Sequence, residues 1–347
     1  MVRDLYPLLR PLLFRMMPET AHGVIFTAGK ALQVLPGGVG LVGLCFDRPG
    51  PEQARTVAGL SFPSALGMAA GLDKGAELLP LWKAMGWGHV EIGTVTPRPQ
   101  PGNPKPRCFR IPEEGLILNR MGFNSEGAGV VAARLKYRPS GIVVGGNLGK
   151  NKATPEEQAL EDYRLAYQRI APEVDYVAIN ISSPNTPGLR NLQTPAALEP
   201  LLHGMLDLRK EMGLERQPLF VKLAPDIPFE ELDAVVDVIA RSGVSGVIAT
   251  NTTLDRSIIR EPHNRAKVEA WGAGGLSGRG LAEKARAVRR RILDRLPPGL
   301  PLIACGGLTT PQDAALALAD GAALVQVYSA FIFEGPWLVS RINRACR

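Results

Sequence analysis

Short apolar segments alternate with helical patterns along most of the chain. Each apolar segment is rich in Val, Ile, Leu and Ala, and most run directly into glycine, asparagine or threonine. A continuous apolar run that ends in turn-forming residues is typical of a strand buried on both faces. Eight such segments occur, at residues 64–70, 89–93, 142–146, 176–179, 219–223, 246–250, 302–305 and 324–327.

Amphipathic helical patterns separate most of these strands, and one more follows the last strand. They cover residues 76–85, 125–135, 155–171, 195–212, 228–242, 281–296, 311–320 and 336–345. Eight strand-then-helix units over residues 62–347 predict an α/β protein built on a (β/α)8 TIM barrel. A doubly wound open sheet is the competing architecture, because it uses the same alternation of strands and helices.

Residues 1–35 carry a different pattern, which predicts a small N-terminal helical hairpin domain. Its apolar positions include Leu5, Leu8, Leu9, Leu12, Leu13, Met16 and Met17. Such an amphipathic hairpin either caps the barrel or rests in the membrane interface as a monotopic helix pair. Residues 36–61 are rich in glycine and proline, and we interpret them as a linker and barrel-bottom segment that leads to the barrel at 62–347.

The composition fits one large domain with this small attachment. Hydrophobic residues make up 45% of the 347, which is ample for one barrel core. The four cysteines are scattered without a CxxC pair and the four histidines lack metal-ligand spacing, so we expect no metal site and no disulfide framework. The net charge of +7 is dispersed, which argues against nucleic-acid binding. No apolar run is long enough to span a bilayer, and a signal peptide is not expected.

The loop at residues 180–190 carries the densest group of polar side chains. It follows the strand at 176–179, and the carboxyl ends of parallel strands are where α/β barrels carry their active sites. Loops after other predicted strands add further amides, so that the rim holds Asn119, Asn147, Asn180, Asn185 and Asn251. Because an amide presents a donor and an acceptor together, this rim suits a flat heterocycle with alternating N–H and C=O groups.

Glycines after the last two strands predict an anion site. Gly306-Gly307 and Tyr328-Ser329 follow these strands, and a glycine-rich segment at 274–280 precedes them. Barrels bind phosphate at this place, since glycine lets backbone N–H groups approach an anion closely. We therefore expect a phosphorylated ligand; the alternative is that these are merely tight turns.

Few side chains are candidates for binding an anion or for accepting a proton. Lys74 and Lys222 lie at or within strand ends, where a lysine either meets an anion or forms a structural ion pair. Asp73 and Asp226 stand in loop positions where capping is the commoner role. Ser183 is the remaining proton acceptor. The residues alone thus predict an enzyme that handles a planar, amide-bearing anion beside a phosphorylated cofactor.

Several ordered runs resemble the dihydroorotate dehydrogenase family, specifically its membrane-associated, quinone-dependent class 2. The matching runs lie at 69–74, 91–100, 119–124, 180–190, 249–253, 274–278 and 324–329, and the resemblance extends over the hairpin as well. It implies the oxidation of (S)-dihydroorotate to orotate in pyrimidine biosynthesis, with a hydride passed to FMN and the electrons then passed to a membrane quinone.

The resemblance also implies roles for individual residues. Ser183 matches the class 2 base, a position that holds a cysteine in class 1. The flavin contacts would be Ala70, Thr94, Asn147, Asn180, Lys222 and Thr250, with Gly278, Gly307, Tyr328 and Ser329 around the phosphate. The substrate contacts would be Lys74, Asn119, Arg120, Met121, Gly122, Phe123, Asn185, Asn251 and Thr252. His22 and Arg110 match quinone-site residues.

In this scheme Ser183 takes a proton from C5 of the substrate while the hydride leaves C6 for flavin N5. Lys74 would pair with the substrate carboxylate, Lys222 would stabilise negative charge on the reduced ring, and residues 184–190 would form a lid. The enzyme would bind the cytoplasmic face of the cell membrane peripherally through its hairpin, without an iron–sulfur partner subunit.

Two positions depart from the family pattern. Gly75-Ala76 stands where a polar residue and a glycine usually follow the lysine, which puts the Lys74 loop geometry in doubt. Gly146 replaces a bulkier aliphatic residue and would loosen packing near the flavin.

Three other functions remain open at this point. A class 1 enzyme that uses fumarate or a NAD-linked iron–sulfur partner is opposed by Ser183 and by the hairpin. A flavin barrel that reduces another ring, such as a dihydropyrimidine or dihydrouridine, would be distinguished by its activity. A non-catalytic membrane-surface protein would be rejected by a preparation whose flavin is bleached by substrate.

Overall fold

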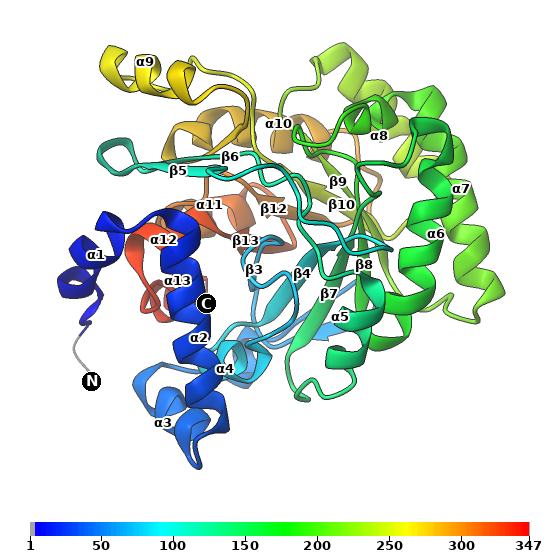
Figure 1. Cartoon of the computed structure of the whole chain (residues 1–347). Coiled ribbons are helices and arrows are strands. Elements are labelled where there is room, and N and C mark those ends of the chain that lie inside the picture. The colour runs from blue at the N-terminus through cyan, green and yellow to red at the C-terminus, as the bar shows by residue number, and fades with distance from the viewer. Residues whose placement is uncertain (1–3, 347) are drawn as a thin grey trace.

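The computed structural model describes residues 4–346, and its centre is a closed barrel of eight parallel strands (Figure 1). Going round the barrel, the strands are β3 (Leu66–Met68), β4 (His89–Val95), β7 (Val143–Leu148), β8 (Tyr176–Asn180), β9 (Leu219–Leu223), β10 (Gly246–Ala249), β12 (Leu302–Cys305) and β13 (Leu324–Val327). β13 pairs in parallel with β3, which closes the ring. The predicted TIM barrel is confirmed, and the open sheet is excluded.

Helices surround the barrel and bury one face each against it. They are α4 (Leu79–Ala84), α5 (Ala128–Leu135), α6 (Ala159–Ile170), α7 (Pro195–Glu211), α8 (Phe229–Ser242), α10 (Ala282–Leu293), α11 (Pro311–Ala319), α12 (Ser329–Glu334) and α13 (Leu338–Ala345). The start of α11 shows how sequence sets a boundary: the Thr310 hydroxyl accepts the Asp313 N–H at 3.1 Å, and the Asp313 carboxylate accepts the Thr310 N–H at 2.9 Å. This reciprocal cap satisfies N–H groups that the first turn leaves free.

The N-terminal region contains three helices and a small hairpin of strands. The helices are α1 (Tyr6–Arg15), α2 (Pro18–Val34) and α3 (Gly38–Cys45), followed by β1 (Arg55–Val57) and β2 (Leu60–Phe62). α1 and α2 were predicted, whereas α3 falls in the segment that we interpreted as a link. α2 packs against α4 of the helix layer. Phe26 of α2 is buried there and contacts Trp82 of α4, with ring centroids 6.1 Å apart. Phe62 closes the bottom of the barrel by packing against His89 and Tyr176.

A second sheet lies beside the barrel opening and was not predicted. It contains β5 (Cys108–Ile111), β6 (Leu116–Asn119) and β11 (Gly275–Gly278) in the antiparallel order β11-β6-β5. The glycine-rich segment at 274–280 therefore forms a strand for much of its length. α9 (Pro262–Trp271) lies against the same sheet, since Trp271 stacks on Phe109 with ring centroids 4.7 Å apart. Residues of all three strands line the cavity at the carboxyl ends of the barrel strands.

The two departures from the family pattern have different consequences. A Cβ atom at Gly146 would lie 2.7 Å from Ile170 of α6, so this glycine faces the helix layer and not the barrel interior. The missing side chain would therefore point away from the barrel interior, and Ile170 packs close to the strand. Ala76, in contrast, has φ +57°, in the left-handed region where a Cβ atom is disfavoured.

We therefore expect Ala76→Gly to change the free energy of unfolding by less than about 0.5 kcal/mol, because relief of left-handed strain offsets both the lost burial of the Ala76 methyl group and the added flexibility of the unfolded chain. Denaturant unfolding of the full chain measures this. Ala133→Gly is the matched control: Ala133 is exposed in α5, so the same substitution should destabilise by about 1 kcal/mol. An equal or larger loss of stability in Ala76→Gly than in Ala133→Gly would contradict the assignment of strain to Ala76.

Candidate active site

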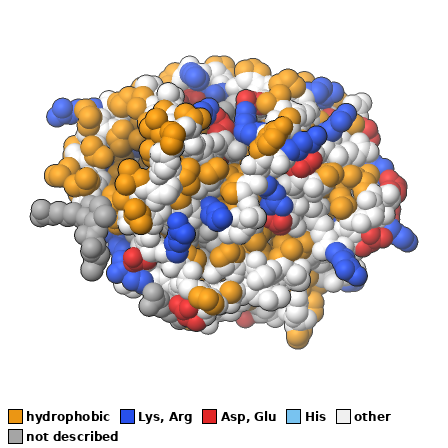
Figure 2. All heavy atoms as spheres, turned by 90° about the horizontal axis from the view of Figure 1, so that it is seen from below, with side chains coloured by type: hydrophobic (Ala, Val, Ile, Leu, Met, Phe, Trp, Pro, Cys, Tyr) orange, Lys and Arg blue, Asp and Glu red, His pale blue; other side chains and the backbone are white. Residues whose placement is uncertain are grey.

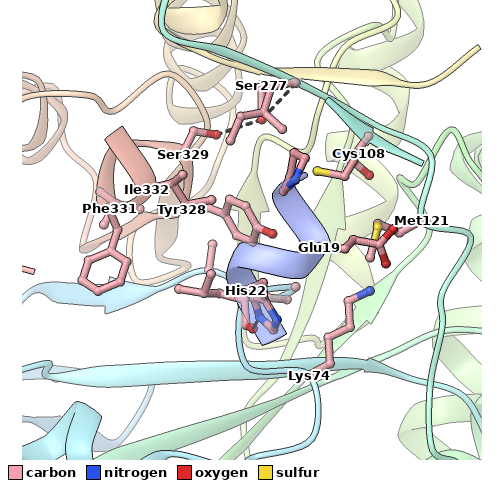
Figure 3. A pocket seen from close by; sticks show the side chains of 18 of the residues that line it. Glu19, His22, Lys74, Cys108, Met121, Ser277, Tyr328, Ser329, Phe331 and Ile332 are labelled. Atoms are coloured by element: carbon pink, nitrogen blue, oxygen red, sulfur yellow. Dashed lines mark hydrogen bonds between the residues drawn. The ribbon is translucent and has the colours of Figure 1, made fainter. Parts of the chain in front are cut away.

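A single cavity of about 930 Å³ extends from α1 and α2 into the carboxyl ends of the barrel strands. Figure 3 shows α2 crossing this space, with His22 and Glu19 on the helix and Lys74, Tyr328 and Ser329 around it. Most of the residues predicted for the site line it: His22, Ala70, Lys74, Thr94, Arg110, Asn119, Met121, Gly122, Phe123, Asn180, Ser183, Asn185, Lys222, Thr250, Asn251, Thr252, Gly278, Gly307, Tyr328 and Ser329. Residues far apart in the chain are thus brought to one connected space.

Two predicted site residues, Asn147 and Arg120, do not line the cavity. Asn147 is fully buried behind it, where its amide accepts from the Thr94 hydroxyl at 2.6 Å and donates to Glu91 at 2.8 Å. The Arg120 guanidinium instead donates to the carbonyls of Trp271 and Ala273 and lies over the Phe109 ring. In this structure its side chain ties the second sheet to α9.

The loop after β8 presents Ser183 to the cavity. Ser183 is 6% exposed, and its Oγ accepts only the Asn185 N–H, at 3.3 Å. The preceding hydroxyl is occupied differently: Ser182 donates to Asn180 at 3.0 Å and accepts from Asn251 at 2.9 Å. No carboxylate or imidazole bonds to Ser183 within residues 4–346. Thr186 of the same loop also has an unpartnered hydroxyl among these residues, but Ser183 lines the cavity and Thr186 does not.

The base of this loop is held by Arg190. Its guanidinium donates to the Ser182 carbonyl at 3.0 Å, to the Thr252 carbonyl at 3.0 Å and to Asp226 at 2.8 Å. Thr186, at the turn of the loop, is buried. The segment predicted as a lid is therefore anchored at its C-terminal end to the loops after β9 and β10.

Lys74 is a cation without a carboxylate partner. Its Nζ donates to the Asn124 side chain, and no carboxylate oxygen lies within 4.0 Å of it in the described chain. Burial, together with the nearby positive charge of Arg107, lowers the pKa of Lys74 to about 8. Glu19 and Cys108 also face it; burial raises the pKa of the Cys108 thiol to about 11, which leaves that thiol neutral. An anion in the cavity would supply the missing counter-charge.

Lys222 differs from Lys74 because it forms an ion pair with a carboxylate that no local sequence pattern indicates. Its Nζ lies 2.9 Å from Oε1 of Glu91, inside the barrel, with side-chain exposures of 5% and 0%. Burial opposes both charges, but their mutual attraction keeps the pKa of Lys222 raised and that of Glu91 lowered. Gln326 and Asn147 each donate to the same carboxylate at 2.8 Å. Lys222 therefore stays protonated at the floor of the cavity.

The two aspartates are occupied structurally. Asp73 accepts the N–H groups of Glu77 and Leu78 at 2.7 and 2.9 Å and the indole N–H of Trp82 at 2.8 Å, so it holds the segment that leads into α4 and does not cap the helix itself. Asp226 does not cap a helix. It pairs with Arg190 and with Lys284 at 2.8 and 2.9 Å, and although burial opposes the charge, its hydrogen bonds lower its pKa. Neither carboxylate is available as a base toward the cavity.

The glycine-rich end of the cavity is formed by the loops after β12 and β13 and by β11. The hydroxyls of Ser277 and Ser329 lie 2.8 Å apart, as the dashed line in Figure 3 shows. Gly307 has φ +70°, and a Cβ there would lie 2.4 Å from Cα of Ala282, at the start of α10. Only glycine fits this close contact between a loop and a helix end.

The opposite end of the cavity is apolar and lies under the N-terminal helices. Its lining includes Leu9, Leu13, Phe14, Ile25 and Leu32. His22 Nε2 lies 2.8 Å from the Leu72 carbonyl, so this nitrogen must donate and Nδ1 is left as the acceptor of the neutral ring. Arg110 donates to the Leu13 carbonyl at 3.3 Å and to that of Met16, and it lies 4.5 Å above the Phe14 ring.

Three buried polar atoms on the cavity wall have no hydrogen-bond partner among residues 4–346. They are Oγ1 of Thr250, Oγ1 of Thr252 and Oε1 of Gln326. Buried polar atoms are ordinarily bonded, so unpartnered ones that line a cavity indicate a polar ligand. The cavity is therefore polar and amide-rich at the barrel and apolar at the helices, which suits two ligands of different character.

The chain is similar along nearly its whole length to proteins of one family. The family model described as dihydroorotate dehydrogenase matches residues 53–346. The "Dihydroorotate dehydrogenase (quinone)" of Methylococcus capsulatus is 45% identical over 340 residues, which cover 97% of each chain. That of Nitrosospira multiformis is 44% identical, with 97% of this chain and 94% of the relative covered. A crystal structure of the Eimeria tenella protein in complex with ferulenol superposes with a TM-score of 0.84 at 34% identity, covering 99% of this chain and 94% of that one.

Proposed function

The chain belongs to the dihydroorotate dehydrogenase family, and from that premise we propose which of its residues perform each step of the reaction. It is an oxidoreductase of the quinone-dependent kind, which oxidises dihydroorotate to orotate in pyrimidine biosynthesis and passes the electrons to a quinone. The individual residue roles, the identity of the flavin and the membrane contact are our proposals.

FMN fits the polar part of the cavity. Unpartnered Thr250 and Gln326 oxygens of its lining residues offer hydrogen bonds to a heteroaromatic ring system, and Gly278 and Gly307, which have no side chain, leave their backbone open to contact with a phosphate. We propose Ala70, Thr94, Asn180, Lys222 and Thr250 for the ring and ribityl chain, and Gly278, Gly307, Tyr328 and Ser329 for the phosphate. When bound, FMN would supply hydride acceptance at N5.

Ser183 removes the C5 proton of dihydroorotate at its Oγ, and its own hydroxyl proton passes to water. This role is supported by the place of Ser183 in the cavity lining and by its Oγ, which accepts a single hydrogen bond, from the Asn185 N–H, among the described residues. Asn119, Asn185, Asn251 and Thr252 bond the ring amides, so that C5 faces Ser183. Held in this way, a weak base acts within a fixed geometry, and alignment contributes more than base strength.

Lys74 binds the substrate carboxylate, and Lys222 would place a positive charge beside the ring of bound FMN. The first role is supported by the absence of a carboxylate partner for Lys74 in the described chain. The second is supported by the Glu91–Lys222 pair, which fixes the ammonium at the floor of the cavity. Charge placed in advance of the reaction needs no rearrangement when the electrons arrive.

The quinone enters between α1 and α2 and meets His22 and Arg110. The protein would rest on the cytoplasmic face of the cell membrane with the exposed apolar side chains of its N-terminal helices in the lipid interface. These include Leu8, Leu12, Val34, Leu35, Leu41 and Leu44. Figure 2 shows hydrophobic side chains gathered on the left of the molecule, where α1–α3 lie in Figure 1. No single described helix is long and apolar enough to cross a bilayer; α2 and α3 meet that test only as a pair bent by 114°.

One observation supports this function above the others. A single cavity connects the polar mouth of the barrel, where three buried side-chain oxygens have no hydrogen-bond partner among residues 4–346, to an apolar channel formed by α1 and α2. Anaerobic mixing of the flavin-loaded protein with dihydroorotate should bleach the flavin, and a long-chain quinone should restore its colour. Bleaching by a dihydropyrimidine or dihydrouridine, with no response to dihydroorotate, would instead assign the barrel to another ring.

We expect orotate binding to depend on pH, because Lys74 loses its charge in an accessible pH range. Its ammonium form binds the carboxylate, and because its pKa is about 8, that form is complete below this pH and is lost above it. The dissociation constant of orotate should therefore be flat at lower pH and rise by up to about tenfold per pH unit above the pKa. Spectroscopic titration of orotate across this range measures it.

Two variants control for this effect. Lys74→Arg keeps its charge throughout, so its orotate affinity should not change with pH in this range. Lys74→Ala should bind orotate weakly at every pH and retain its flavin. Unchanged orotate affinity in Lys74→Ala would place the anion site elsewhere.

A further inference from the structure

A cation is buried behind the glycine-rich end of the cavity. Arg289, on α10, is 5% exposed. No carboxylate oxygen of residues 4–346 lies within 4.0 Å of it, and the neighbouring Asp320 is paired with Arg286 at 2.7 Å. Charged side chains are rarely this buried without a paired ion. Burial lowers the pKa of Arg289 to about 10, which still leaves the group charged at neutral pH.

The Arg289 guanidinium bonds to the loop that follows β12. Its Nη1 donates to the Cys305 carbonyl at 3.1 Å and to the Gly306 carbonyl at 2.9 Å. Cys305, Gly306 and Gly307 all line the cavity. The loop thus lies between Arg289 on one side and the cavity on the other.

These hydrogen bonds determine which way the loop's backbone donor points. In a trans peptide the C=O and the N–H point in opposite directions. Because the Gly306 carbonyl points to Arg289, the N–H of Gly307 in the same peptide unit points away from it, toward the cavity side. The start of α10 packs against Gly307 from behind, since a Cβ there would lie 2.7 Å from the Ala282 nitrogen. Helix α10 therefore both packs against this loop at Gly307 and carries Arg289, the cation that bonds to the carbonyls of the loop.

We propose that Arg289 is a positioning residue for the phosphate of the cofactor: its charge attracts the dianion through the loop, and its hydrogen bonds aim the Gly307 N–H at it. This inference rests on the proposed binding of FMN. It adds a residue outside the cavity that never touches the ligand, and it explains why an unpaired guanidinium is tolerated in the core.

The test compares FMN with riboflavin, which lacks the phosphate, in binding titrations with the full-length chain stripped of flavin. Arg289→Gln keeps an N–H donor for the carbonyls but removes the charge. It should weaken FMN binding by about tenfold or more and riboflavin binding by less than about threefold. Arg289→Lys keeps the charge, so its FMN-to-riboflavin affinity ratio should stay within about threefold of the parent ratio.

Equal weakening of both flavins in Arg289→Gln would overturn the proposal and make Arg289 a purely structural residue. If Arg289→Gln does not fold, Arg289→Lys decides alone, because a tenfold fall of its affinity ratio contradicts the role of charge. A parent chain that binds neither flavin would instead refute the proposed cofactor. In the flavin-loaded protein, phosphorus NMR should show the phosphate titrating at higher pH in Arg289→Gln than in the parent.

Discussion

Ser183→Ala is expected to retain bound flavin and to lose about 10²–10⁴-fold in the rate at which dihydroorotate reduces it, the usual cost of removing a general base. The reason is that the candidate carboxylates of the described chain are already bonded to other groups. Asp73 accepts three N–H groups of residues 77–82, Asp226 is held by Arg190 and Lys284, and Glu91 is paired with Lys222. Rapid mixing under anaerobic conditions, followed by flavin absorbance, measures this single step without the quinone.

Two further substitutions make the result specific. Ser183→Cys retains an ionisable acceptor, so its flavin reduction should exceed that of Ser183→Ala and should increase with pH as the thiolate forms. Thr186→Val removes another buried hydroxyl of the same loop that has no partner in the described chain, and it should keep a near-parent rate. A Ser183→Ala rate within a few-fold of the parent would remove Ser183 from the mechanism.

The barrel was predictable because its strands are buried on both faces and therefore read as continuous apolar runs. Each predicted run overlaps an observed strand, and the proline at 195 and the Thr-Pro pair at 310–311 mark helix starts. α3 was missed because its sequence, Gly38–Cys45, contains three glycines, which signal a link. β5, β6 and β11 are four residues each, too short to show a period.

The site was predictable to the extent that its residues lie at strand ends. Glu91 was missed because it lies within β4 among apolar residues, and its partner Lys222 is 131 positions away. No local pattern connects two such side chains; only closure of the barrel does. Arg120 shows the reverse case. It belongs to a run that matches the family, yet its side chain bonds to Trp271 and Ala273, away from the cavity. The match of residues 119–124 to the family therefore indicates how the backbone runs, but it does not establish where each side chain points.

A chain shortened to begin at Met17 is expected to keep the flavin-reduction step and to lose most of its reaction with long-chain quinone. It lacks α1, which has no buried residue, and keeps α2, whose Phe26 belongs to the core. Leu9, Leu13 and Phe14 line the apolar end of the cavity. Loss of these contacts with a quinone tail should lower kcat/KM for that quinone by about 10²-fold, because 10²-fold corresponds to about 2.8 kcal/mol, the value of one to two fully buried apolar side chains, and the three contacts with the tail are partial. A short, water-soluble quinone should be affected only a few-fold, because it does not depend on the channel.

Exposed leucines of α1 provide a control that distinguishes the role of α1 in quinone access from its role in membrane association. Leu8 and Leu12 are 77% and 62% exposed and do not line the cavity. Changing both to serine should weaken association with lipid vesicles while leaving the quinone kinetics in detergent unchanged. The shortened chain should fail in both assays, because it loses the outer surface and the channel wall together. If it retained flavin and still reduced long-chain quinone at the full-length rate, α1 would be a structural cap, and the route of the quinone would have to lie along α2 alone.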